Sequence, residues 1–140
     1  MVKSYVLDTS AIFTLAKAED GSNTVEDILI AARKGRSYAY MSFISLMELY
    51  YITWQEKSET AAKEMIILVK SLPVQKVDSN ERITFSAGRI KAHHRLSVAD
   101  AFIAATAMDK DAILVHKDPE LEIIPKYIET LPLPYKRGKS

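Results

Sequence analysis

The 140-residue sequence contains no cysteine and only four glycines. The missing cysteines exclude a disulfide framework, a thiolate zinc site and a cysteine nucleophile. The glycines form neither GxGxxG nor GxxxxGK(S/T), which argues against dinucleotide binding and P-loop nucleotide binding. Any chemistry must therefore use oxygen and nitrogen side chains, and the composition suits a reducing compartment such as the cytoplasm.

A long apolar run and a large net charge are also missing. No apolar stretch is long enough to span a bilayer, and the N-terminus has neither the charged nor the apolar region of a signal peptide. The 19 basic and 18 acidic residues leave a formal net charge of +1. We therefore expect a cytoplasmic protein without a membrane segment, in which a local basic patch must bind any nucleic acid.

The hydrophobic pattern predicts one domain, residues 1–131, in which strands and helices alternate. Fully apolar runs at 5–7 and 112–115 are typical of strands buried on both faces of a parallel sheet. With helices between the strands, we expect a three-layer α/β/α fold with right-handed crossovers. Residues 132–140, proline-rich and then basic, are expected to form a loose tail. The other expected elements are helices at 11–16, 24–34, 43–54, 58–72, 79–94 and 97–108 and strands at 37–41, 73–78 and 127–129.

The expected helix at 43–54 is apolar on nearly all sides, which is more than one core-facing stripe requires. Either the helix is buried on several sides, or it forms part of a subunit interface. We favour the subunit interface. Its apolar side chains include Leu46, Met47, Leu49, Tyr50, Ile52 and Trp54.

Four acidic residues fall at strand ends or near helix beginnings. Asp8 and Asp118 follow the apolar strands, whereas Glu48 and Asp100 each come three residues after a serine near the start of a helix. Taken singly, Asp8 is better explained as an N-cap, and Glu48 and Asp100 as parts of capping boxes. In a parallel sheet, however, the carboxyl ends of strands and the amino ends of the following helices share one edge. We therefore expect all four carboxylates at one rim.

Such a carboxylate cluster is repulsive unless a cation neutralises it. Oxygen ligands suit a hard octahedral ion such as Mg²⁺ or Mn²⁺, which binds phosphate oxygens and activates water. We expect Asp8, Asp100 and Asp118 to be direct ligands, and Glu48 to bind a second ion or to orient the attacking water. Ser10 is expected to hold Asp8 or a metal-bound water. The predicted chemistry is metal-dependent hydrolysis of a phosphodiester.

Four segments of the sequence resemble the PIN-domain ribonucleases, and within that family the VapC-type toxins of prokaryotic toxin–antitoxin pairs. The segments follow the family's order across nearly the whole chain, and the one around Asp100 is the most specific. They are VLDTSA at 6–11, SLMEL at 45–49, LSVADAFIAATA at 96–107 and ILVHKDPE at 113–120.

The resemblance implies a three-layer α/β/α fold, endonucleolytic cleavage of RNA, a homodimer, and the toxin role in a type II pair whose VapB-like antitoxin blocks the site. It also implies that the four acids together bind Mg²⁺ or Mn²⁺. One departure concerns His116, because the family often has threonine or serine two residues before its last acid. Glu120 is therefore a candidate to share the role of Asp118.

Other functions fit parts of the sequence. A PIN-like domain can retain its acids for stability and act as a non-catalytic interaction module, or process RNA without an antitoxin. A phosphoacceptor or phosphatase with Asp8 as its nucleophile is a poor match, because Ser10 stands where a second acid is needed. A histidine site from His93, His94 or His116 is also disfavoured, since the adjacent pair points to different sides of a helix.

Local positive charge marks the candidate RNA interface. Lys91, Arg95 and Lys117 lie near the ends of the segments that carry Asp100 and Asp118. They are candidates for contacts with RNA phosphates. Solvated charges that complement the end of a helix explain them equally well.

Overall fold

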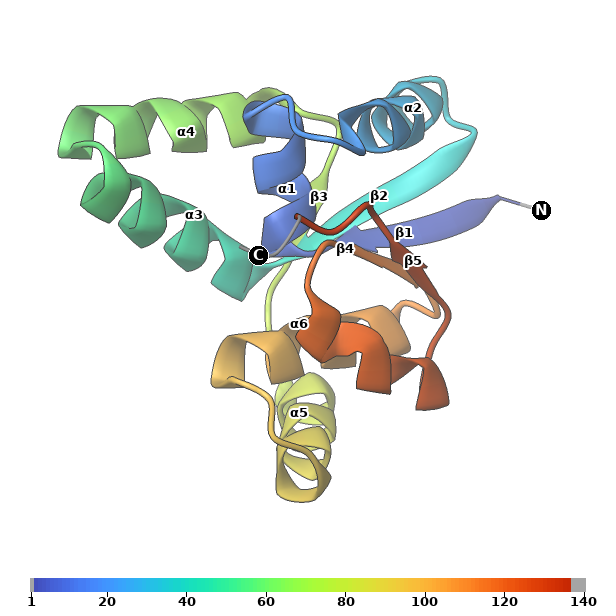
Figure 1. Ribbon diagram of the computed structural model, residues 1–140. Helices are drawn as coiled ribbons and strands as arrows, with labels where there is room; N and C mark the ends of the chain where they lie inside the picture. The colour runs from blue at the N-terminus through green and yellow to red at the C-terminus, as the bar shows by residue number, and fades with distance from the viewer. Residues whose placement is uncertain (1, 137–140) are drawn as a thin grey trace.

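The computed structural model describes residues 2–136. Its centre is a five-stranded sheet of order β3-β2-β1-β4-β5, in which every neighbouring pair is parallel. Helices cover both faces, which confirms the predicted three-layer α/β/α fold (Figure 1). The strands are β1 (Lys3–Leu7), β2 (Ser37–Ser42), β3 (Gln75–Val77), β4 (Ile113–His116) and β5 (Thr130–Pro132).

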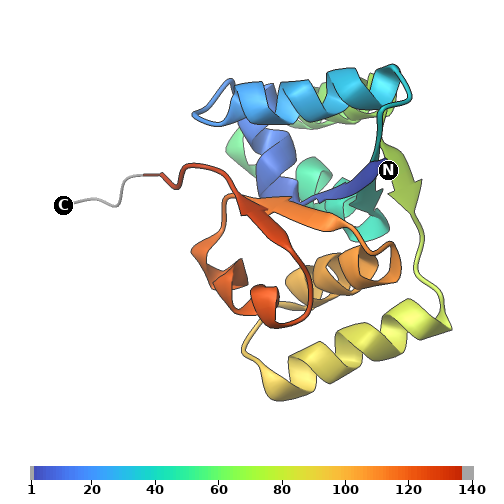
Figure 2. The ribbon, with the colours of Figure 1, turned by 90° about the vertical axis from the view of Figure 1, so that its right-hand side faces the viewer.

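The helices form the two outer layers of the fold (Figure 2). One layer contains α1 (Thr9–Ala16), α2 (Ser22–Arg33), α3 (Phe43–Glu56) and α4 (Glu59–Ser71), and the other α5 (Glu81–His93), α6 (Val98–Asp109) and the 3-10 helix η1 (Pro119–Lys126). The successive residues Val6 and Leu7 of β1 are both fully buried, but on opposite faces of the sheet. Val6 belongs to the core beneath α5 and α6, and Leu7 belongs to the core beneath α1 to α4. Burial on both faces explains why the strand lacks polar alternation.

Most predicted elements are present with small shifts of their ends, but three details were wrong. The helix η1 was not predicted, and the last strand is Thr130–Pro132 instead of 127–129. The second helix begins at Ser22, directly after Gly21 at φ 99°, and so starts two residues before the predicted 24. Among the described residues, no helix is both long and apolar enough to cross a membrane.

The packed domain extends past the predicted boundary at residue 131. Leu133 is only 2% exposed, and its backbone N–H donates to the His116 carbonyl at 2.7 Å. The Tyr135 hydroxyl donates to Glu122 Oε1, also at 2.7 Å. The segment expected to be a loose tail is therefore packed against the domain as far as the structure describes it, and residues 137–140 lie outside that part of the chain.

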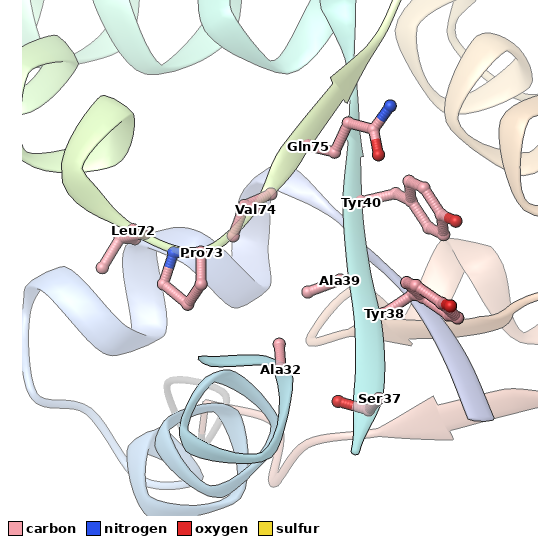
Figure 3. A pocket seen from close by; sticks show the side chains of 9 residues that line it. All are labelled: Ala32, Ser37, Tyr38, Ala39, Tyr40, Leu72, Pro73, Val74 and Gln75. Carbon is pink, nitrogen blue, oxygen red and sulfur yellow. The ribbon is translucent and has the colours of Figure 1, made fainter. Parts of the chain in front are cut away.

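The edge strand β3 pairs with only the second half of β2, from Tyr40 to Ser42. The first half of β2 borders a shallow groove, lined also by Ala32 and by 72–74 (Figure 3). Tyr38 points away from this groove and stacks on Tyr40, with ring centroids 6.3 Å apart. The groove lies towards the amino ends of the strands, away from the edge where the acids gather.

Candidate metal centre

The structure brings the four predicted acids together at the carboxyl edge of the sheet. Asp8 directly follows β1, and Asp118 lies two residues beyond the end of β4. Glu48 lies in the second turn of α3, whereas Asp100 lies in the first turn of α6. Burial, and then repulsion by Asp8, Asp118 and Glu48, raises the pKa of Asp100, so the four carboxylates are near enough to interact electrostatically.

A fifth carboxylate, that of Glu120, joins this cluster. Carboxylate oxygens of Asp100, Asp118 and Glu120 lie within 4.8 Å of one another. Asp118 also caps η1, because its side chain accepts the Glu120 backbone N–H at 2.9 Å. Several carboxylate oxygens at this spacing form the donor set that hard divalent cations prefer. Glu120 thus lies beside Asp118, where the sequence suggested that it can share the role.

Asp8 is 3% exposed and is held by Ser10 at the start of α1. Its Oδ2 accepts the Ser10 backbone N–H at 3.1 Å and also the Ser10 hydroxyl. Burial raises the pKa of Asp8 to about 6; the two Ser10 hydrogen bonds oppose this, and repulsion by Glu48 and Asp118 adds to it. Asp8 is therefore both a helix cap and a member of the acidic cluster.

Ser10 also connects the first helix to the end of β4. Its Oγ accepts the backbone N–H of Lys117 at 2.8 Å while its proton goes to Asp8. The hydroxyl thereby fixes the distance between the segment that carries Asp8 and the segment that carries Asp118. This is the geometry expected of a residue that positions a metal ligand.

Glu48 is held by Thr9, which the sequence analysis did not identify. The buried Thr9 hydroxyl donates to Glu48 Oε1 at 2.7 Å and lies 2.9 Å from Ser45 Oγ. The capping box considered for Ser45 and Glu48 does not form, because α3 begins at Phe43 and is capped by Ser42. The available signal was the position of Thr9, a hydroxyl directly after Asp8.

Asp100 follows the N-cap of α6, as its spacing predicted. Ser97 Oγ accepts the Asp100 backbone N–H at 3.1 Å. Burial, and then repulsion by Asp8, Asp118 and Glu48, raises the pKa of Asp100 to about 7. A helix N-terminus by itself favours the ionised acid. Burial and repulsion therefore outweigh the helix dipole at this position.

A family model described as the PIN domain matches residues 5–127. The chain belongs to the PIN domain family. It has no match among curated proteins.

Several solved structures share the fold of this PIN domain. VapBC2 from Rickettsia felis, bound to a DNA fragment from its promoter, is 21% identical, with a TM-score of 0.74 over 93% of this chain and 98% of that chain. DNA-bound VapBC from Salmonella typhimurium is 23% identical, with a TM-score of 0.73 over 94% and 98%. VapC20 of Mycobacterium tuberculosis, a toxin that cleaves the sarcin–ricin loop, is 18% identical, with a TM-score of 0.69 over 89% and 97%. At these identities the likeness shows the fold alone.

His116 occupies the position in this PIN domain where the resemblance leads us to expect a hydroxyl. The ring is 1% exposed, and its Nδ1 accepts the Asp118 backbone N–H at 3.1 Å. Burial lowers the pKa of His116, and the negative charges of Asp118 and Glu122 only partly oppose this. The Nδ1 that accepts this N–H carries no proton, and the buried imidazole supports the loop of Asp118 at the position where a hydroxyl was expected.

Two of the three predicted phosphate contacts are engaged within the PIN domain itself. The side chain of Lys117 is 5% exposed, with its Nζ 3.7 Å from Glu19 Oε1. Lys91 Nζ donates to the Leu96 carbonyl at 2.9 Å. Arg95 is exposed to solvent. Of these three, Arg95 alone is both exposed and without a side-chain hydrogen bond or ion pair among the described residues.

The histidine site considered from the sequence does not form in this PIN domain. His93 Nδ1 lies 2.9 Å from the Arg89 carbonyl, within the same helix. His94 Nε2 instead lies 2.6 Å from the Tyr127 hydroxyl. The two rings thus have separate partners, and His116 is buried beneath the loop of Asp118.

Proposed function

We propose that this PIN domain is a Mg²⁺- or Mn²⁺-dependent endoribonuclease that acts in the cytoplasm as the toxin of a type II toxin–antitoxin pair. The observation that carries the proposal is the gathering of carboxylates from four separate segments at one edge of the sheet. Membership of the PIN domain family supports the nuclease, and the likeness to VapBC complexes supports the toxin role.

The donor set fits a hard divalent cation. Asp8 and Asp100 have pKa values raised to about 6 and 7, so that near pH 7 the cluster holds several carboxylates that repel one another. We assign Asp8, Asp100 and Asp118 as direct ligands, with Glu120 beside them. A bound ion polarises a phosphoryl oxygen and lowers the pKa of a coordinated water.

Neighbouring residues hold this donor set in place. Ser10 fixes Asp8 against the end of β4, and Thr9 fixes Glu48. Because Glu48 is oriented by a hydrogen bond to a buried hydroxyl, we assign it the orientation of the attacking water or the binding of a second ion. Removing groups that orient metal ligands typically lowers metal affinity 10- to 100-fold.

Cleavage of defined RNAs with and without Mg²⁺ or Mn²⁺ tests the proposal. We expect the wild type to cleave RNA only when metal is present. Asp100→Asn removes a metal ligand, so its cleavage rate should fall on the order of 100-fold or more. Asp27→Asn, an exposed change on α2, is the matched control and should keep full activity. If metal neither supports cleavage nor raises the unfolding midpoint, the nuclease proposal fails, and a non-catalytic PIN module becomes the better explanation.

A groove between α3 and α4 is our candidate antitoxin site. It measures 510 Å³ and is lined by apolar side chains, among them Met47 (53% exposed) and Ile67 (70% exposed). Lys63 and Lys70 also line it, so an amphipathic helix with acidic flanks is the partner of matching chemistry. The toxin–antitoxin complexes among the similar structures support such a partner.

Ile67→Glu tests this assignment. The genomic sequence immediately upstream is first searched for a short reading frame; when its product is co-expressed, the variant should keep RNA cleavage but escape inhibition. Inhibition of Ile67→Glu as strong as that of the wild type would exclude the groove. The homodimer remains a separate prediction, which analytical ultracentrifugation of the purified chain checks.

A further inference from the structure

A cavity adjoins the carboxylate cluster. It measures 380 Å³ and is bordered by Ser10 and Asp118 on one side and by Phe13 and Tyr135 among its other lining residues. Cavities of about 300–1,000 Å³ are the usual size of ligand sites. Because Asp118 borders both the cavity and the cluster, anything bound in the cavity lies directly beside the candidate metal centre.

The aromatic side chains of this cavity suit a nucleobase. The Tyr135 ring is held in place by its hydrogen bond to Glu122 and lies 6.2 Å from the His116 ring, measured between centroids. Phe13 lines the cavity from α1. Aromatic faces of this kind stack unpaired bases with little preference for sequence.

Two lysines supply accessible positive charge along the same cavity. Lys17 Nζ lies 3.2 Å from Glu56 Oε2, in a side chain that is 32% exposed. Lys136 Nζ lies 3.0 Å from Glu19 Oε2, in a side chain that is 69% exposed. Surface ion pairs of this kind are weak. An RNA phosphate can therefore compete with the carboxylates for both ammonium groups.

We propose that this cavity binds one nucleotide of single-stranded RNA beside the scissile phosphate, with its base on Tyr135 and its neighbouring phosphates on Lys17 and Lys136. The inference rests on the proposed ribonuclease function and specifies where that site holds its substrate. An unpaired base is required, because only a splayed base presents its face to an aromatic side chain. The segment that carries Tyr135 and Lys136 thus forms part of the substrate site.

RNA affinity tests the proposal without relying on cleavage. Binding of a labelled single-stranded RNA is measured with Mg²⁺ in the Asp100→Asn background, to which Tyr135→Leu or Tyr135→Phe is added. Tyr135→Leu should weaken binding about fivefold or more, the lower end of what base–aromatic stacking contributes. Tyr135→Phe keeps the stacking ring but loses the hydrogen bond to Glu122, so it should bind more weakly than its parent and more tightly than Tyr135→Leu. Tyr38→Leu, a change at an exposed tyrosine on β2, is the matched control.

Salt dependence tests the phosphate contacts. Lys136→Gln should reduce the slope of log affinity against log salt by about 0.7, as expected for one lost contact to a single strand. Equal affinity of Tyr135→Leu and its parent overturns the nucleotide site, whereas metal-dependent cleavage by the wild type still supports the nuclease. Failure of the parent to bind RNA also overturns the nucleotide site, and the nuclease is then judged by metal-dependent cleavage by the wild type alone.

Cross-linking keeps the proposal testable if Tyr135→Leu does not fold. RNA containing 4-thiouridine is irradiated with the Asp100→Asn protein, whose Tyr135 is unchanged, and the linked peptide is identified by mass spectrometry. Linkage to the peptide of Tyr135 or of Phe13 supports the proposal. Linkage confined to other peptides overturns it.

Discussion

Replacing Asp100 by asparagine is expected to stabilise the metal-free protein at pH 8. Burial and repulsion raise the pKa of Asp100 from 3.8 to about 7. At about 1.4 kcal/mol per pKa unit, ionising this group in the folded state costs roughly 4 kcal/mol at most. Solvent screening of a partly exposed side chain reduces this to about 2 kcal/mol. The lost charge at the N-terminus of α6 costs about 0.3–1 kcal/mol, so repulsion wins and the variant gains about 1–2 kcal/mol.

The same argument fixes the sign of the pH dependence. Between about pH 4 and pH 7 the folded protein binds more protons at Asp100 than the unfolded chain does, so stability falls as the pH rises. Asp8, with its pKa raised to about 6, contributes in the same direction between about pH 4 and pH 6. The lowered pKa of His116 acts in the opposite direction, but it does so in both proteins. From pH 5 to pH 8, the stability of Asp100→Asn should therefore rise relative to that of the wild type.

Urea unfolding in EDTA at pH 5 and pH 8 measures both effects, with Asp27→Asn as the surface control. Added Mg²⁺ at about a hundred times its dissociation constant should stabilise the wild type by about 2.7 kcal/mol and leave Asp100→Asn nearly unchanged. The reasoning is refuted if Asp100→Asn is less stable than the wild type at pH 8 without metal. Asp100 would then serve mainly to stabilise the start of α6.

Three further changes test the supports of the site and of the fold. Ser10→Ala removes a hydroxyl donor to Asp8 and should lower Mg²⁺ affinity 10- to 100-fold, seen as a smaller metal-induced rise in the unfolding midpoint; an unchanged rise would contradict it. Leu133→Ala leaves a cavity at a buried position and should lower the free energy of unfolding, measured with urea, by about 2–4 kcal/mol. A loss of less than about 0.5 kcal/mol would show that the segment is not part of the core. Gly21→Ala places a side chain on a residue with φ 99°, and its Cβ would lie only 3.0 Å from Pro134 Cδ. The free energy of unfolding should therefore fall by more than about 1 kcal/mol. A variant as stable as the wild type would exclude this packing.

The sequence predicted the layers of the fold because its strands are buried on both faces. The runs at 5–7 and 112–115 carry no polar residue, and in a 140-residue chain only helices on both sides of a sheet provide that burial. Small residues made α6 predictable as well. Its alanines at 101, 104, 105 and 107 are all buried, so this helix lies close to the sheet.

The region after β4 was predicted poorly because long-range contacts determine its structure. The helix η1 is held by Leu121 and Ile124, both fully buried, and a 3-10 segment of eight residues has no strong periodic signal. The position of β5 depends on its register with β4, in which Leu114 pairs with Thr130. Local propensity contains no information about that register, and Pro132 at its end argues against a strand.

The candidate site shows the same division between local and distant information. The location of Asp8 and Asp100 followed from local chemistry, because both occupy helix starts. The contact between Thr9 and Glu48 joins residues 39 positions apart and depends on how α1 packs against α3. The burial of Lys117 depends likewise on the fold, and it removes a cation that the sequence offered for RNA.

Capping and metal binding do not exclude each other as roles of the acids, because in the structure one carboxylate can do both. Asp8 accepts the Ser10 N–H with one oxygen, Oδ2, so the other oxygen has no part in that cap. The cap fixes the rotation of the carboxylate, which orients the remaining oxygen with little loss of entropy. A residue that satisfies a local rule is therefore no weaker a candidate for chemistry. What distinguishes a functional cap is its surroundings: Asp8 is buried and faces other acids, an arrangement that costs stability until a cation binds.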